Sequence, residues 1–166
     1  TRFLDLEKAE AQARESQIEG ALEKIRSHTM GMRSSEDLAN VASVMFDQMR
    51  ILGGDLFSFG IVLCDKHENM VEQWHSIPGA GMMAPFFVPV NLDHIHQYRY
   101  DQWKTGTELF SIVIPEDYIA HHFELMLALP SVKAEWEGLA AQNIALPPIP
   151  TWEIDYGASF RYGYLL

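Results

Sequence analysis

Residues 15–53, ESQIEGALEKIRSHTMGMRSSEDLANVASVMFDQMRILGG, decide how the chain is organised. The stretch is typical of two helices separated by a break at Ser34 and Ser35, whose hydroxyls precede the acidic Glu36 and Asp37 as at a helix N-terminus. We expect the first helix to pair with another helix and the second to lie on a sheet. No catalytic motif occurs in the stretch.

The pairing prediction rests on apolar residues that recur every seven positions through residues 1–33. A seven-residue repeat favours a left-handed pair of helices. The predicted dimer interface consists of Leu4, Ala11, Ile18, Leu22, Ile25 and Met32. Lys8 and Glu15 interrupt the second apolar row. Packing of this helix on its own domain is therefore the alternative to a parallel dimer.

The second helix carries apolar residues at helical spacing from Leu38 to Leu52, and Gly53 and Gly54 end it. The next run, FSFGIVLC at 57–64, alternates in the manner of a strand. Large residues share one face of that strand, and small ones line the other (Ser58, Gly60, Val62 and Cys64). A sheet face of small side chains leaves room for either a helix or a ligand.

The rest of the chain predicts a mixture of strands and helices. A return strand runs to residue 77, then a loop, PGAGM, leads to a strand at about 84–90. Asp93 begins a helix that Gly106 stops, and a strand follows at 108–114. The remaining elements are a helix from Pro115 to about residue 129, a helix at 132–142, and two closing strands after 150. The predicted class is α+β, a central antiparallel sheet flanked by helices.

Composition narrows the classes of function. The chain has 166 residues, 48% of them hydrophobic, which suits one globular domain with an appendage. Its net charge of -11 argues against binding to nucleic acid or to an anionic membrane surface. No run approaches the roughly 18 apolar residues of a membrane span, and a single cysteine suits a reducing compartment. We expect a cytoplasmic piece of a longer protein, because the chain lacks an initiator Met and stops within a strand-like run.

The sequence predicts neither a catalytic nor a metal site. Two histidine pairs, His94 with His96 and His121 with His122, are the only clusters. The two pairs could meet in space and bind a transition metal. However, residues one or two apart on a helix do not share a face, so solvated helix histidines are expected. Cys64 lies in a strand and is expected to be a buried apolar group and not a nucleophile. No cofactor is required.

Aromatic residues provide the only candidates for a ligand pocket. They are numerous enough to line an apolar cavity with a few polar tips, although core packing explains most of them. The candidates are Trp74, Phe86, Tyr98, Trp103, Phe110 and Tyr156.

One run, ALEKIRSHTMGMRSSEDLANVASVMFDQMRILG, closely resembles the linker and first helix of GAF-like domains in bacterial multidomain sensor histidine kinases. The resemblance implies a GAF-like sensor domain at 34–166 behind a signalling helix at 1–33. It transfers no ligand residue, because the cyclic-nucleotide signature is absent and Asp65, not His, follows Cys64. The kinase's own histidine and ATP-binding boxes are also absent.

The predicted function is therefore non-catalytic sensing or signal relay. The domain would dimerise through residues 1–33 and pass changes induced by a small-molecule ligand or a partner to a kinase or other output domain in the same full-length chain. Two alternatives remain open. One is a ligand-free structural spacer or protein-docking module, and the other is a small metal- or cysteine-dependent enzyme.

Overall fold

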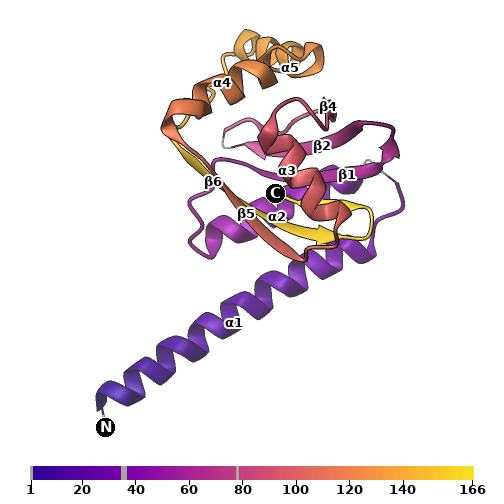
Figure 1. Ribbon diagram of the computed structural model, residues 1–166. Helices are drawn as coiled ribbons and strands as arrows, with labels where there is room; N and C mark the ends of the chain where they lie inside the picture. Colours follow the sequence, from indigo (N-terminus) through magenta and orange to yellow (C-terminus); the bar gives the residue numbers. More distant parts are fainter. Residues whose placement is uncertain (1, 35–36, 78) are drawn as a thin grey trace. The chain divides into compact units, whose positions relative to one another are not determined.

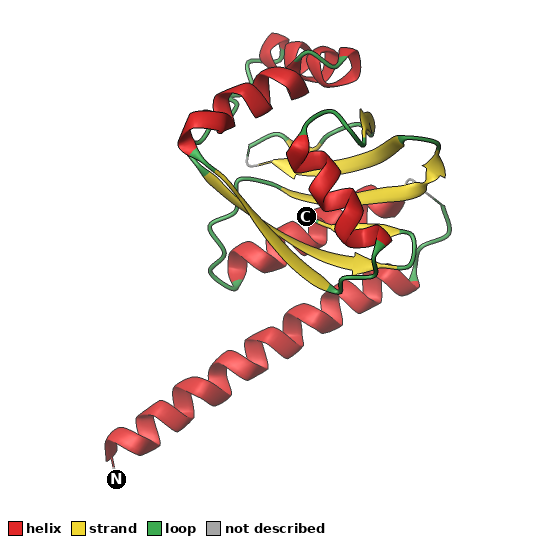
Figure 2. Cartoon of the chain, in the orientation of Figure 1, coloured by secondary structure: helices red, strands yellow, loops and turns green. Residues whose placement is uncertain are grey.

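The computed structural model describes residues 2–34, 37–77 and 79–166, and the chain divides into two compact units, Thr1–Leu56 and Phe57–Leu166. The predicted domain boundary at residues 33–34 lies inside the first unit. The described residues form five helices and a seven-stranded sheet in which every pair of strands is antiparallel (Figures 1 and 2). The predicted α+β class with a long N-terminal helix is confirmed. None of the described helices is long and apolar enough to cross a membrane.

The first unit contains two helices, α1 (Arg2–Met30) and α2 (Asp37–Ile51). Both were predicted from their apolar spacing, and they contact each other. At 29 residues, α1 is about 44 Å long. Only Ala21 is buried within α1, so the rest of this helix is solvated or half-buried in the single chain. The packing of α2 on a sheet stays a prediction.

The predicted interface residues of α1 keep much of their apolar surface in water. Leu4 is 66% exposed, Ile18 40% and Leu22 44%. Ala11 is also exposed, and Ile25 is half-buried. Met32 is half-buried too, but it lies beyond the end of α1 at Met30 and so outside the helix in which it was predicted. An apolar stripe of this kind on a solvated helix remains available for a partner.

The break between the two helices is capped by an acidic side chain. The carboxylate of Asp37 accepts the backbone N–H groups of Arg33 (2.7 Å) and Ser34 (2.9 Å), and it also accepts the Ser34 hydroxyl. These contacts lower the pKa of Asp37, and the hydrogen bond from the Arg33 backbone has the largest effect. Within the described residues the Ser34 hydroxyl donates to Asp37, and the predicted cap by a serine hydroxyl stays a prediction. Ser35 and Glu36, which belong to the same prediction, lie outside the described residues.

The second unit contains the sheet and three helices. The strands are β1 (Phe59–His67), β2 (Met70–Ile77), β3 (Gly81–Met82), β4 (Phe86–Pro89), β5 (Leu109–Ile114), β6 (Glu153–Phe160) and β7 (Gly163–Leu165). The helices are α3 (His94–Lys104), α4 (Glu116–Leu127) and α5 (Pro130–Ala141). The strand order is β3-β2-β1-β7-β6-β5, and β4 also pairs with β2. The edge strand β5 lies between α3 and α4 in sequence.

Two details differ from the predicted elements. The predicted PGAGM loop contains the two-residue strand β3, which pairs with the end of β2. Helix α5 begins at Pro130, two residues earlier than predicted, because proline needs no N–H partner in the first turn of a helix. The predicted signals at Asp93 and Gly106 are confirmed: Asp93 caps α3, and Gly106 follows it with φ 76°.

One face of the sheet, called here the helical face, is covered by helices of this unit. Register and alternation place Val62, Cys64, His75, Phe86, Phe110, Asp155, Gly157 and Tyr164 on it. Its apolar members form the main core cluster, against which Tyr98 and Trp103 of α3 and Trp136 of α5 pack. The small side chains predicted for this face of β1 therefore make room for helices.

Candidate functional site

The structure brings together four of the six predicted pocket residues. Phe86 and Phe110 lie in the main core cluster, and Tyr98 and Trp103 pack against it. The edge of the Tyr98 ring meets Phe110 with centroids 6.2 Å apart, and the Tyr98 hydroxyl donates to the Ser111 carbonyl. These four side chains therefore belong to one packed core on the helical face.

The other two predicted pocket residues lie on the opposite face of the sheet. Trp74 pairs with Ile61 and donates its indole N–H to Glu72 at 2.7 Å. Tyr156 pairs with Ser111 and is exposed. A single pocket lined by all six aromatics is therefore not formed, because strand alternation sends these two away from the other four.

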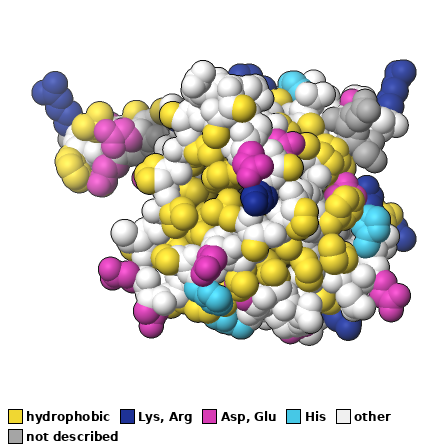
Figure 3. Space-filling view, turned by 90° about the horizontal axis from the view of Figure 1, so that it is seen from above, with side chains coloured by type: hydrophobic (Ala, Val, Ile, Leu, Met, Phe, Trp, Pro, Cys, Tyr) yellow, Lys and Arg dark blue, Asp and Glu magenta, His cyan; other side chains and the backbone are white. Residues whose placement is uncertain are grey.

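Helix α3 borders a shallow hollow of about 390 Å³. Its lining is mostly polar and includes none of the six predicted aromatics; the lining residues are Asn69, Val90, Asn91, Gln97, Tyr100, Asp101 and Lys104. Apolar side chains instead gather where α4 and α5 lie. Partly buried residues of α4, of α5 and of the segment that follows α5 pack on the core there. Figure 3 shows hydrophobic side chains gathered on the face seen from above, with few charged groups among them.

The most concentrated group of chemically active side chains is a triad of Asp93, His96 and His122. His96 Nδ1 lies 2.8 Å from Asp93 Oδ1, and His122 Nδ1 lies 2.6 Å from Asp93 Oδ2. The side chains of Asp93, His96 and His122 are 2%, 1% and 7% exposed. The two imidazole rings stack with centroids 5.1 Å apart and planes at 20°. One carboxylate thus joins two buried histidines from different helices.

Local structure positions each member of this triad. Asp93 is the N-cap of α3, and its Oδ1 also accepts the backbone N–H of His96 at 2.9 Å. His96 lies in the first turn of α3, three residues after the cap. His122 reaches the same carboxylate from α4, after the chain has passed through β5. The triad therefore depends on the way α3 and α4 pack together at the edge of the sheet.

Electrostatics fix the protonation of Asp93 and His96. Burial opposes the charge of Asp93, but hydrogen bonds from His122 and His96 outweigh burial and hold its pKa well below the usual range. Burial lowers the pKa of His96 to about 4, although the hydrogen bond to Asp93 opposes this shift. An ionised carboxylate can only accept, so neutral His96 donates through Nδ1 and carries its lone pair on Nε2. That Nε2 is buried without a hydrogen-bond partner among the described residues.

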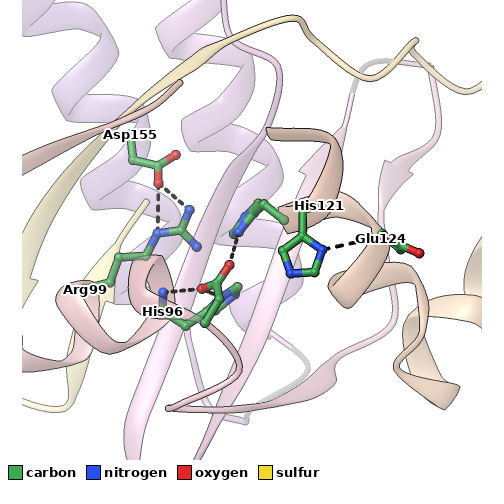
Figure 4. A network of polar contacts seen from close by, with 7 residues as sticks. His96, Arg99, His121, Glu124 and Asp155 are labelled. Atoms are coloured by element: carbon green, nitrogen blue, oxygen red, sulfur yellow. Dashed lines mark hydrogen bonds and ion pairs between the residues drawn. The ribbon is translucent and has the colours of Figure 1, made fainter. Parts of the chain in front are cut away.

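A second buried polar group lies beside the triad. Arg99 of α3 donates to Asp155 of β6 through Nε at 2.8 Å and through its NH2 group, and both side chains are buried. Figure 4 shows the guanidinium directed at Asp155, whereas His121 turns toward Glu124. Burial would lower the pKa of Arg99, but the negative charge of Asp155 outweighs burial and raises it. The pair ties the middle of α3 to the helical face.

Two further titratable groups adjoin this ion pair. Burial, and then the negative charge of Asp155, raise the pKa of Glu153 to about 7. Burial, and then the positive charge of Arg99, lower the pKa of His75 to about 4. The His75 ring lies against Gly60, where a Cβ atom would come 2.6 Å from its Nε2. The positive charge of Arg99 therefore acts on both carboxyl groups of β6, those of Asp155 and Glu153, and His75 stays neutral near it.

Cys64 is buried in the core of the second unit. Its side chain is part of the main core cluster, and burial raises the pKa of the thiol to about 12, with a smaller contribution from Asp65. The thiolate is the reactive form of cysteine, and this raised pKa disfavours the thiolate near neutral pH. The predicted role of a buried apolar group is confirmed.

The sequence prediction for the histidines is wrong for one member of each pair. His94 and His121 are exposed as expected, whereas His96 and His122 are buried. A meeting of the two pairs in space was the less favoured alternative, because two histidines of one helix do not share a face. One histidine from each helix is enough, and the capping residue Asp93 between them was not among the expected ligands. The available clue was the spacing of a capping Asp and a His three residues later, both in the first turn of one helix.

Comparisons of the chain with protein-family models, with curated proteins and with solved structures found no match. The fold and the side-chain geometry are therefore the basis for any functional conclusion.

Proposed function

We propose that this chain is a non-catalytic sensory or signal-relay domain, carried on a helical stalk that dimerises. The proposal assigns it to the GAF-like domains of bacterial sensor histidine kinases, with a cytoplasmic location and an output domain elsewhere in the full-length protein. The carrying observation is the exposed apolar stripe of α1, which repeats every seven residues along a helix that buries only Ala21.

A helix that packs against nothing is only marginally stable in water. A helix gains most of its stability in proteins from packing one apolar face, and α1 leaves Leu4, Ile18 and Leu22 largely in water. A seven-residue apolar repeat keeps its seam facing a second helix that carries the same repeat. A second copy of the chain supplies an identical stripe, so the proposed partner of α1 is α1 of a second chain. Two such helices can pass a shift or rotation to whatever follows them.

Sedimentation velocity at micromolar concentration tests the stalk. We expect the wild-type chain to dimerise and the double variant Ile18→Glu/Leu22→Glu to be monomeric, because four carboxylates would enter the seam. The matched control is Ala9→Glu/Ser16→Glu, which adds the same charge at exposed positions on the other side of the helix. A wild-type chain that stays monomeric, or a control that dissociates as fully as the seam variant, would refute the stalk.

One observation favours a second candidate function, a ligand-free spacer or docking domain. Four of the predicted pocket aromatics pack into the core cluster, where they already have partners. A thermal-shift screen against nucleotides, tetrapyrroles, amino acids and small acids separates the two functions, since a ligand that binds the folded state raises its stability. Stabilisation by one class supports sensing, whereas no shift in any class supports the spacer.

A further inference from the structure

We infer that Asp93, His96 and His122 form a binding site for a divalent first-row transition-metal ion of the Zn²⁺ type. One ligand atom from each residue lies within 4.8 Å of the other two, and all three side chains are buried. This inference does not rest on the proposed signalling function.

The donor set selects the class of ion. Two imidazole nitrogens and one carboxylate oxygen suit Zn²⁺, Co²⁺, Fe²⁺ or Ni²⁺. Ca²⁺ and Mg²⁺ prefer six or more oxygen ligands, which this triad lacks. Three protein ligands leave a further coordination position for water or another small molecule. The net charge of -11 also favours the approach of a cation over that of an anion.

The triad is held in place before any ion binds. Asp93 is fixed by the backbone N–H of His96, and His96 is fixed within the first turn of α3. His122 lies parallel to His96 in a ring stack, held by its own contact with Asp93. A preorganised set of ligands loses little conformational freedom on binding, which favours affinity.

Two short contacts show what an ion would replace. Without metal, the nitrogens facing Asp93 donate protons, at separations of 2.8 Å for His96 and 2.6 Å for His122. Ligand atoms around a tetrahedral Zn²⁺ are about 3.3 Å apart, given metal–ligand bonds of about 2.0–2.1 Å. The contacts would therefore open by about 0.5 Å at His96 and about 0.7 Å at His122. In a neutral ring the proton moves from Nδ1 to Nε2, the Nδ1 lone pair binds the ion, and no proton is released.

The hydrogen bonding of His96 differs from that of an ordinary core histidine. A buried polar atom without a partner costs folding free energy, and native proteins carry few of them. A hydrogen-bonded core histidine normally satisfies both ring nitrogens. Here Asp93 uses the Nδ1 of His96, and Nε2 has no partner among the described residues. Within the described part of the chain, His96 therefore lacks the full set of hydrogen bonds that a purely structural core histidine makes.

Titration of the tag-free, chelator-treated chain with Co²⁺ tests the site, with Zn²⁺ as competitor. We expect one ion per chain, visible d–d absorption typical of low coordination number, and its loss when Zn²⁺ is added. His122→Gln and Asp93→Asn should each weaken binding at least about 10-fold. Asn retains the capping function at position 93. The control, His94→Gln/His121→Gln, removes two exposed neighbouring histidines and should leave the affinity unchanged.

A second measurement needs only the wild-type chain, so it stays decisive if the variants fail to fold. Long-range ¹H–¹⁵N spectra of the histidine side chains should show two buried rings changing tautomer as Zn²⁺ is added. The inference is overturned if the wild-type chain binds no ion at micromolar concentration, or if only exposed histidines respond. It is also overturned if the control variant loses binding. Metal binding and dimerisation are measured separately, so either proposal can fail alone.

Discussion

Removing Asp155 should destabilise the chain strongly, because Arg99 would be left with a buried charge and no partner. Both side chains are almost fully enclosed, at 5% and 4% exposed. Breaking a buried pair by removing one member costs about 3–5 kcal/mol. We expect Asp155→Ala to lose that amount of unfolding free energy. The loss should lie toward the lower end, because the ionised form of Glu153 can partly replace the missing charge.

The relative stabilities of four variants test whether an unpaired buried charge causes this loss. Arg99→Met should cost less than Asp155→Ala, since a carboxylate left alone can take up a proton, whereas a guanidinium cannot lose one. The double variant Arg99→Met/Asp155→Leu removes both charges and should lie within about 1 kcal/mol of wild type or above it. Asp117→Ala, at an exposed position of α4, should stay within about 0.5 kcal/mol.

Urea unfolding followed by far-ultraviolet circular dichroism measures these differences as shifts in midpoint at constant slope. The prediction of an unpaired buried charge at Arg99 is refuted if Asp155→Ala lowers the free energy of unfolding by less than about 1 kcal/mol. It also fails if the double variant is no more stable than Asp155→Ala, because the cost would then come from lost packing and not from an unpaired charge.

Two further predictions concern Glu153 and two glycines. The pKa of Glu153 is raised from 4.5 to about 7 by burial and then by Asp155, so its contribution to stability is complete below pH 4.5 and is lost as pH rises through 7. Glu153→Gln should match wild type at low pH and exceed it by up to about 3 kcal/mol at pH 8 in urea unfolding, whereas parallel pH curves would contradict this. Gly60→Ala should cost about 1–3 kcal/mol, because its Cβ would strike the His75 ring. Gly138 lies in α5 with open space around it, so Gly138→Ala should instead raise the free energy of unfolding by about 0.5–1 kcal/mol. Equal melting temperatures for the two alanine variants would contradict both glycine predictions.

Local chemistry in the sequence was enough to determine the elements and their class. The apolar spacing of α1 and α2, the cap at Asp93, the stop at Gly106 and the alternation of β1 each depend on neighbours within a few residues. These signals are readable because helix and strand periods differ and because capping is local. The start of α5 was misjudged because Pro130 can either follow a helix or begin one.

Only the tertiary structure decided which distant side chains meet. Strand register placed Phe110 on the helical face and Tyr156 on the other, which separated the predicted pocket residues. The packing of α3 and α4 around β5 brought His122 to Asp93 across 29 positions, and the position of α3 on the sheet brought Arg99 to Asp155 across 56. Contacts at such separations depend on how whole elements pack, and no local pattern in the sequence encodes them. The sequence therefore determined the helices, strands and repeating stripe, and the tertiary structure determined the buried triad and ion pair.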